Sequence, residues 1–236
     1  MRHRVHGKQL GRNTGQRKAL QLALATALAT LALCACQAPV KPDQPATTAV
    51  TAPPAAPNPF FTASPLPLQF PQFDQIQDVH FGPAFDRGMA EQLGEIDAIV
   101  NNPAAPSFDN TILAMERSGQ VLQRTATVFF SLVGADTNDA RKAIQADYSP
   151  KLAAHRDAIY LNPKLFERVS SLYRQRNQLG LDAEGVRLIE RYHDDFVRAG
   201  AELGAAQQER LKVINGELAK LATRFSQNVL AEVNDS

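Results

Sequence analysis

Apolar residues beyond Phe73 recur at steps of three and four, and this spacing limits the fold more than any other feature. The first such run predicts a helix from about Pro83 to Val100, which Asn101-Asn102-Pro103 should end; its apolar face consists of Phe85, Met89, Leu93, Ile96 and Val100. No stretch alternates apolar and polar residues long enough to indicate a strand. We therefore predict an all-α, multi-helix domain from residue 73 to residue 236.

Stop and start signals divide the rest of this domain into five more helices. Ser107 or Asp109 can cap a second helix that Gly134 ends. A third follows Asn138, and we expect Pro150 to kink or divide it because proline cannot donate the helical hydrogen bond. Asn162 as cap and Pro163 at the first position begin a fourth, near 164–178.

The last two predicted helices carry the clearest apolar spacing. Asp182 can cap a fifth helix whose apolar residues extend to Leu203. The sixth, near 205–233, has apolar residues at alternating steps of three and four, which is the spacing of a coiled-coil seam: Leu211, Ile214, Leu218, Leu221 and Phe225.

The N-terminal residues have the layout of a secretory signal. Residues 1–18 are basic, and the fifteen residues 19–33 are apolar and uncharged, which is short of the roughly 20 needed to span a bilayer. Leu33-Cys34-Ala35-Cys36 resembles a bacterial lipobox. We expect 1–35 to be a lipoprotein signal peptide and Cys36 to be acylated, with Cys34 as the other possible acceptor. Two alternatives are an ordinary signal peptide without acylation and a redox pair formed by the two cysteines.

The resemblance to a lipobox implies a periplasm-facing protein of the cell envelope. Gln37, in place of an aspartate, favours the outer membrane. Residues 36–72 are rich in proline and alanine, a composition typical of an extended tether between a lipid and a domain.

The charge distribution argues against a nucleic-acid partner. The net charge is +1, but residues 1–18 hold six basic residues and no acid, so the remainder carries −5. A mildly acidic body lacks the clustered lysine and arginine that displace counterions from a phosphate backbone. We expect no nucleic acid among its partners.

The sequence contains no HExxH motif, P-loop, GxSxG or GxGxxG motif. His193-Asp194-Asp195 could suggest a metal site, but adjacent helical residues point in different directions. Glu91 and Glu95 share a helix face and could form an acid/base pair, although such pairs are usually solvated surface charges. Both cysteines precede the body, which excludes a thiol nucleophile there; a serine nucleophile stays open. We assign no catalytic or metal-binding residue.

A series of ordered motifs resembles the N-terminal part of the bacterial peptidyl-dipeptidases, also called dipeptidyl carboxypeptidases, of the thimet oligopeptidase family. They run from Asn58-Pro59-Phe60 through His80-Phe81-Gly82-Pro83 and Asn101-Asn102-Pro103 to Leu161-Asn162-Pro163-Lys164 and Asp195-Phe196-Val197-Arg198-Ala199-Gly200. The resemblance implies an oligopeptidase-like (neurolysin-like) helical domain that forms one wall of a channel for short peptides.

The same resemblance bears on cofactor and activity. Members of that family are zinc peptidases that remove C-terminal dipeptides, and their zinc-binding and catalytic residues follow the part matched here. We therefore expect a truncated, exported peptidase segment without its catalytic domain, inactive alone and with no zinc of its own. The alternative is a non-catalytic helical envelope lipoprotein that binds peptides or a partner protein.

Overall fold

The computed structural model describes residues 57–234, so the signal peptide, Cys34, Cys36 and most of the expected tether lie outside the described residues. The chain divides into two units, Met1–Thr51 and Ala52–Ser236, and everything below concerns the second. Within residues 57–234 no helix is long and apolar enough to cross a membrane.

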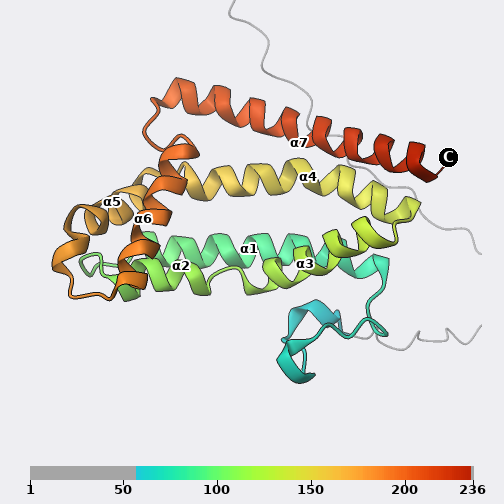
Figure 1. The fold of residues 1–236 in the computed structure, drawn as a ribbon, viewed down its shortest axis with the longest axis horizontal. Coiled ribbons are helices and arrows are strands. Elements are labelled where there is room, and N and C mark those ends of the chain that lie inside the picture. Colours follow the sequence, from blue (N-terminus) through green and yellow to red (C-terminus); the bar gives the residue numbers. More distant parts are fainter. Residues whose placement is uncertain (1–56, 235–236) are drawn as a thin grey trace, which may run out of the picture. The chain divides into compact units, whose positions relative to one another are not determined.

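Seven α-helices build the described part, and residues 57–234 contain no strand, which confirms the all-α prediction (Figure 1). Their bounds are α1 Phe81–Val100, α2 Ala114–Arg117, α3 Gln120–Ala135, α4 Asp139–Tyr160, α5 Pro163–Gln175, α6 Ala183–Arg198 and α7 Ala205–Asn234. Short 3₁₀ helices lie at Pro59–Phe61, Pro67–Gln69, Asp78–His80 and Arg176–Gln178, and a π-helical turn at Phe108–Leu113 leads into α2.

Side-chain caps begin the helices where the sequence places them. Asn162 Oδ1 accepts hydrogen bonds from the backbone N–H groups of residues 164 and 165, with Pro163 at the first helical position. Asp182 accepts from the N–H of Gly185 at the start of α6. Ser107, rather than Asp109, is the cap of the segment that becomes α2. Each cap satisfies donors that a helix start leaves without partners.

Two of the predicted helix boundaries are wrong. Gly119 adopts a left-handed conformation (φ +71°) and separates α2 from α3, where the sequence suggested one helix. Pro150 does not divide α4, which is continuous from Asp139 to Tyr160. Tyr148 on one side of the proline and His155 on the other are both buried, so packing against neighbouring helices stabilises the continuous helix despite the lost hydrogen bond.

Leu203 also lies outside the helix in which it was predicted. Helix α6 ends at Arg198, and the chain turns through Gly200, whose φ of +96° suits glycine, before α7 begins at Ala205. Leu203 lies in this turn and is 40% exposed, so the apolar spacing continued past the true end of the helix.

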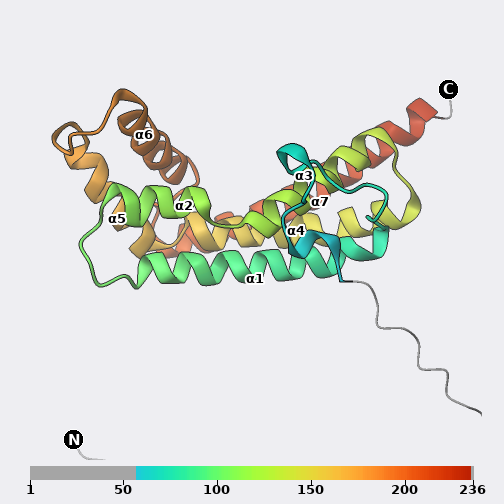
Figure 2. The same ribbon diagram turned by 90° about the horizontal axis from the view of Figure 1, so that it is seen from below.

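Two hydrophobic clusters form the core, and α1 contributes to both. The first cluster is aromatic and contains Phe60, Phe81, Phe85, Phe129 and Tyr148, with Ala84 and Val128. The second is mostly aliphatic and contains Ile96, Ile99, Ile112, Met115, Ile159, Leu165, Val169, Leu172, Ile189 and Phe196. In Figures 1 and 2, α3 and α4 run alongside α1, while α5 and α6 lie near its C-terminal end.

Residues that the sequence assigned to the tether take part in the aromatic cluster. The Phe60 ring is buried and lies 5.2 Å, centroid to centroid, from the Phe81 ring. Asn58 Nδ2 donates to the carbonyl of His80, and Arg124 Nε donates to the carbonyl of Phe60. The core therefore extends N-terminal to the expected domain start at residue 73.

Helix α7 packs on α4 through polar side chains (Figure 1). Asn215 Nδ2 donates to Asp157 Oδ1 at 2.8 Å, and Thr223 Oγ1 donates to Ser149 Oγ at 2.8 Å. Gln227 Nε2 lies 3.0 Å from both the Lys142 carbonyl and Gln145 Oε1. The contact is therefore fixed by hydrogen bonds that define its register, rather than by apolar burial.

Replacing Gly88 by alanine tests the close approach of α1 and α3. A Cβ atom at Gly88 would lie 2.7 Å from the backbone nitrogen of Leu122, so the two helices must separate. We expect Gly88→Ala to lower the free energy of unfolding by about 1–3 kcal/mol, measured by urea denaturation. Gly94→Ala on the same helix is the control, because nothing lies within 4 Å of its Cβ position. It should raise stability by up to about 1 kcal/mol; equal effects of the two variants would contradict the packing.

Candidate functional site

The histidines of the described part serve separate structural contacts. His80 Nδ1 accepts a hydrogen bond from the backbone N–H of Gln77 at 3.0 Å. His155 is buried on α4, and the His193 ring stacks on Tyr173 with centroids 3.8 Å apart. No group of three or more His, Cys, Asp or Glu side chains among residues 57–234 is arranged to hold a metal ion. These residues do not fit a zinc site.

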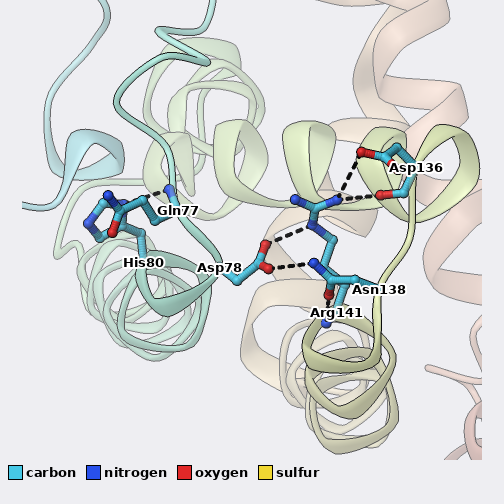
Figure 3. Close-up of polar contacts among 6 residues, drawn as sticks. All are labelled: Gln77, Asp78, His80, Asp136, Asn138 and Arg141. Atoms are coloured by element: carbon cyan, nitrogen blue, oxygen red, sulfur yellow. Dashed lines mark hydrogen bonds and ion pairs between the residues drawn. The ribbon is translucent and has the colours of Figure 1, made fainter.

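The segment before α1 that contains His80 is joined to the start of α4 by a polar network of its own (Figure 3). Asp78 accepts from Arg141 Nε and from Asn138 Nδ2, each at 2.7 Å. Arg141 also donates to the backbone carbonyl of Asp136. The Asp78 carboxylate thus accepts from both the Asn138 amide and the Arg141 guanidinium. These hydrogen bonds hold the segment before α1 against the start of α4.

The His193-Asp194-Asp195 sequence does not form a cluster of ligands. The imidazole of His193 lies between the rings of Tyr173 and Phe166, and the Asp195 carboxylate pairs with Arg191 one helical turn earlier at 3.9 Å. The histidine therefore acts as an aromatic packing group between α5 and α6.

Glu91 and Glu95 likewise have different partners. Glu91 Oε1 pairs with Arg87 Nε at 2.6 Å on the surface of α1. Glu95 Oε2 accepts a hydrogen bond from the backbone N–H of Gly119 at 2.6 Å, at the turn that begins α3. One carboxylate forms a surface ion pair and the other fixes a turn, which favours the structural interpretation over an acid/base pair.

A cavity of about 360 Å³ with charges of both signs lies between α4, α6 and α7. Its charged lining residues are Arg156, Asp157, Asp195 and Arg198. Asp157 is buried; its Oδ1 accepts from Asn215, whereas Oδ2 has no hydrogen-bond partner among the described residues.

This cavity can attract polar groups, but its lining includes no serine, threonine, cysteine or histidine to act as nucleophile or base. Sequence reasoning missed it because its residues come from three helices. The only local signal was a charged residue, Asp157, beside the apolar Ile159 of α4.

The imidazole of His155 is a buried titratable group on α4. Its Nε2 donates to Gln92 Oε1 at 2.7 Å, and Nδ1 has no hydrogen-bond partner among residues 57–234. Burial lowers the pKa of His155 below its ordinary value of 6.5, because the charged form loses hydration. The folded chain therefore holds this histidine neutral.

We predict that acidification destabilises the fold through His155. Since the folded pKa is lower than the unfolded one, the unfolded chain binds more protons, and stability falls as pH drops below about 6.5 toward the folded pKa. Thermal denaturation at pH 7.5 and pH 5.5 should show a smaller loss of Tm for His155→Gln than for the original chain. The difference in Tm between the variant and the original chain at pH 7.5 gives the loss of stability caused by the substitution itself. If His155→Gln lost as much Tm between pH 7.5 and pH 5.5 as the original chain, the prediction would be contradicted.

Comparison with known proteins identifies relatives of the chain. No protein-family model matches it. It is 48% identical over 174 residues to the dipeptidyl carboxypeptidase of Salmonella typhimurium, and 47% identical over 174 residues to that of Escherichia coli.

The aligned residues make up 74% of this chain and 26% of each relative. The chain thus spans about a quarter of the length of the curated relatives it matches. Identity of this extent confirms the resemblance drawn from the motifs. The chain belongs with the bacterial dipeptidyl carboxypeptidases, of which it matches a fragment.

Proposed function

We propose that residues 57–234 form one helical wall of the substrate channel of a peptidyl-dipeptidase, an enzyme that removes dipeptides from the C-termini of short peptides. The supporting observation is the 47–48% identity to two dipeptidyl carboxypeptidases over 174 residues. On this proposal the wall provides shape and restricts access, and the hydrolytic chemistry comes from the part of the enzyme that these residues do not match.

The roles of the polar side chains in the described part support this division. Peptide hydrolysis needs an activated water or nucleophile, together with groups that stabilise the developing charge. Here Glu95 fixes a turn, Asp78 joins two segments and His193 packs between aromatic rings. We therefore propose that the 236-residue chain by itself does not cleave peptides, and that zinc chemistry requires residues outside 57–234.

A chimeric enzyme tests the proposal. The 174 residues of the Escherichia coli dipeptidyl carboxypeptidase that align with this chain would be replaced by the matching residues of this chain. We expect the chimera to release C-terminal dipeptides from a short N-blocked peptide, because residues that are nearly half identical should build the same wall. Product release would be followed by mass spectrometry, with the parent enzyme as reference.

Two controls make the result decisive. The parent enzyme lacking the aligned segment and the 236-residue chain alone should both release no dipeptide. Dipeptide release by the chain alone, or a chimera that is folded by circular dichroism but inactive, would contradict the proposal.

We further propose that the chain is exported and held at the outer membrane, facing the periplasm, by a lipid on Cys36. The support is the order of basic, apolar and cysteine-containing residues before position 37 and the proline-rich stretch after it. Such a tether would leave the helical domain at the envelope, where short peptides are available.

Metabolic labelling with radioactive palmitate tests the anchor. In a bacterial host we expect Cys36→Ser to abolish labelling and processing, and Cys34→Ser, the matched control, to retain both. Labelled protein should fractionate with the outer membrane. Labelling that survives in Cys36→Ser but is lost in Cys34→Ser would show that Cys34 is the acylated residue. Absence of label from the original chain would contradict the lipid anchor.

A further inference from the structure

A cavity of about 310 Å³ lies between the segment before α1 and helix α3. Residues 59–76 form one wall and residues 120–128 form the other. The two walls are joined by hydrogen bonds and by core packing: Arg124 Nε donates to the carbonyl of Phe60 at 2.7 Å, and the Phe60 ring is buried. None of the lining residues belongs to α7, so contacts inside the N-terminal half of the described part shape this cavity.

The lining of the cavity combines apolar surface with a few polar groups. Phe60 and Val128 are buried members of the aromatic cluster, and the half-buried Ile76 continues their apolar surface. The polar groups include the side-chain amides of Gln72 and Gln123. This is the composition of sites that bind small molecules, in which apolar surface holds the body of the ligand and a few polar groups orient it.

Arg124 is the one charged residue in this lining. Its hydrogen bond to the Phe60 carbonyl uses Nε and leaves the two Nη atoms to bind another acceptor. Within residues 57–234 Arg124 has no ion pair, because the nearby Glu91 is paired with Arg87 at 2.6 Å. Partial burial lowers the pKa of Arg124, yet a guanidinium stays charged at neutral pH. The cavity therefore favours an anionic ligand.

A strained turn forms part of the cavity wall. Leu68 and Gln69 have φ values of +56° and +55°, in the left-handed region that favours glycine. Ser64 Oγ donates to the carbonyl of Phe70 at 2.6 Å and closes the turn. Backbone strain of this kind persists where surrounding contacts impose it, and it is concentrated at sites that bind ligands.

We propose that this cavity binds a small carboxylate with an apolar body. The carboxylate accepts hydrogen bonds from the Nη atoms of Arg124, a pairing that guanidinium geometry suits. The apolar body lies against Phe60 and Val128. The C-terminal residue of a short peptide and a medium-chain aliphatic acid share this chemistry. Such binding goes beyond the proposed role as a channel wall, which requires no ligand here.

Nuclear magnetic resonance titration of the ¹⁵N-labelled full chain tests the proposal, with Cys34→Ser and Cys36→Ser in place so that no thiol or acyl group interferes. The probes are N-acetyl-leucine, which represents a peptide C-terminus, and hexanoate, which represents an aliphatic acid. Their amide shifts should be concentrated in residues 59–76 and in α3. N-Acetylleucinamide, which lacks the carboxylate, should bind at least about tenfold more weakly than N-acetyl-leucine.

Two variants examine the charge and the space separately. Arg124→Gln removes the charge and should weaken binding of the acids about tenfold. Because it also removes the hydrogen bond to Phe60, Thr127→Trp is the second variant: it fills the cavity from an exposed position on α3 and should abolish binding. Arg187→Gln is the matched control, since Arg187 is an exposed arginine on α6 outside the cavity, and it should bind like the original chain.

The two acids distinguish the source of the ligand. Tighter binding of N-acetyl-leucine supports a peptide C-terminus, tighter binding of hexanoate supports an aliphatic acid, and equal binding supports the shared chemistry. Absence of shifts with both acids would overturn the proposal. So would equal binding of the neutral amide, or unchanged binding of the acids to Thr127→Trp.

Discussion

The close packing of α1 against its neighbours is the contact on which the rest of the domain depends. The N-terminal half of α1 places Phe81 and Phe85 in the aromatic cluster, and its C-terminal half places Ile96 and Ile99 in the aliphatic one. Between them Gly88 lets the backbone of α3 approach within contact distance. Because one continuous helix joins both clusters, the short helices at one end and the N-terminal segment at the other are held in a single body.

Local chemistry predicted much of this fold from sequence, and its errors arise where tertiary contacts outweigh local preference. Asn162 and Asp182 cap helices as expected because a cap is a contact within a few residues. Pro150 remains inside α4 because buried neighbours hold the helix. The buried Arg168 guanidinium, bonded to the carbonyls of residues 102 and 104, could not be foreseen, since its partners lie more than sixty residues away.

The candidate functional residues show the same limit. Sequence reasoning favoured non-catalytic roles for His193 with its aspartates and for Glu91 with Glu95, but it could not name their partners, because spacing does not reveal them. The structure gives each a nearby partner: aromatic rings for His193, Arg87 for Glu91 and a backbone amide for Glu95. The family resemblance was visible in short motifs, whereas the charged cavity beside Asp157 needed three helices to be brought together.

The central proposal is that residues 57–234 hold no zinc ion by themselves, since no group of three or more His, Cys, Asp or Glu side chains among them is arranged to hold a metal ion. Elemental analysis of zinc in the purified chain tests it most directly, with Cys34→Ser and Cys36→Ser in place so that thiols outside the described residues do not contribute. After incubation with zinc and gel filtration, we expect far less than one zinc per chain. A zinc ion retained in one-to-one stoichiometry would contradict the claim.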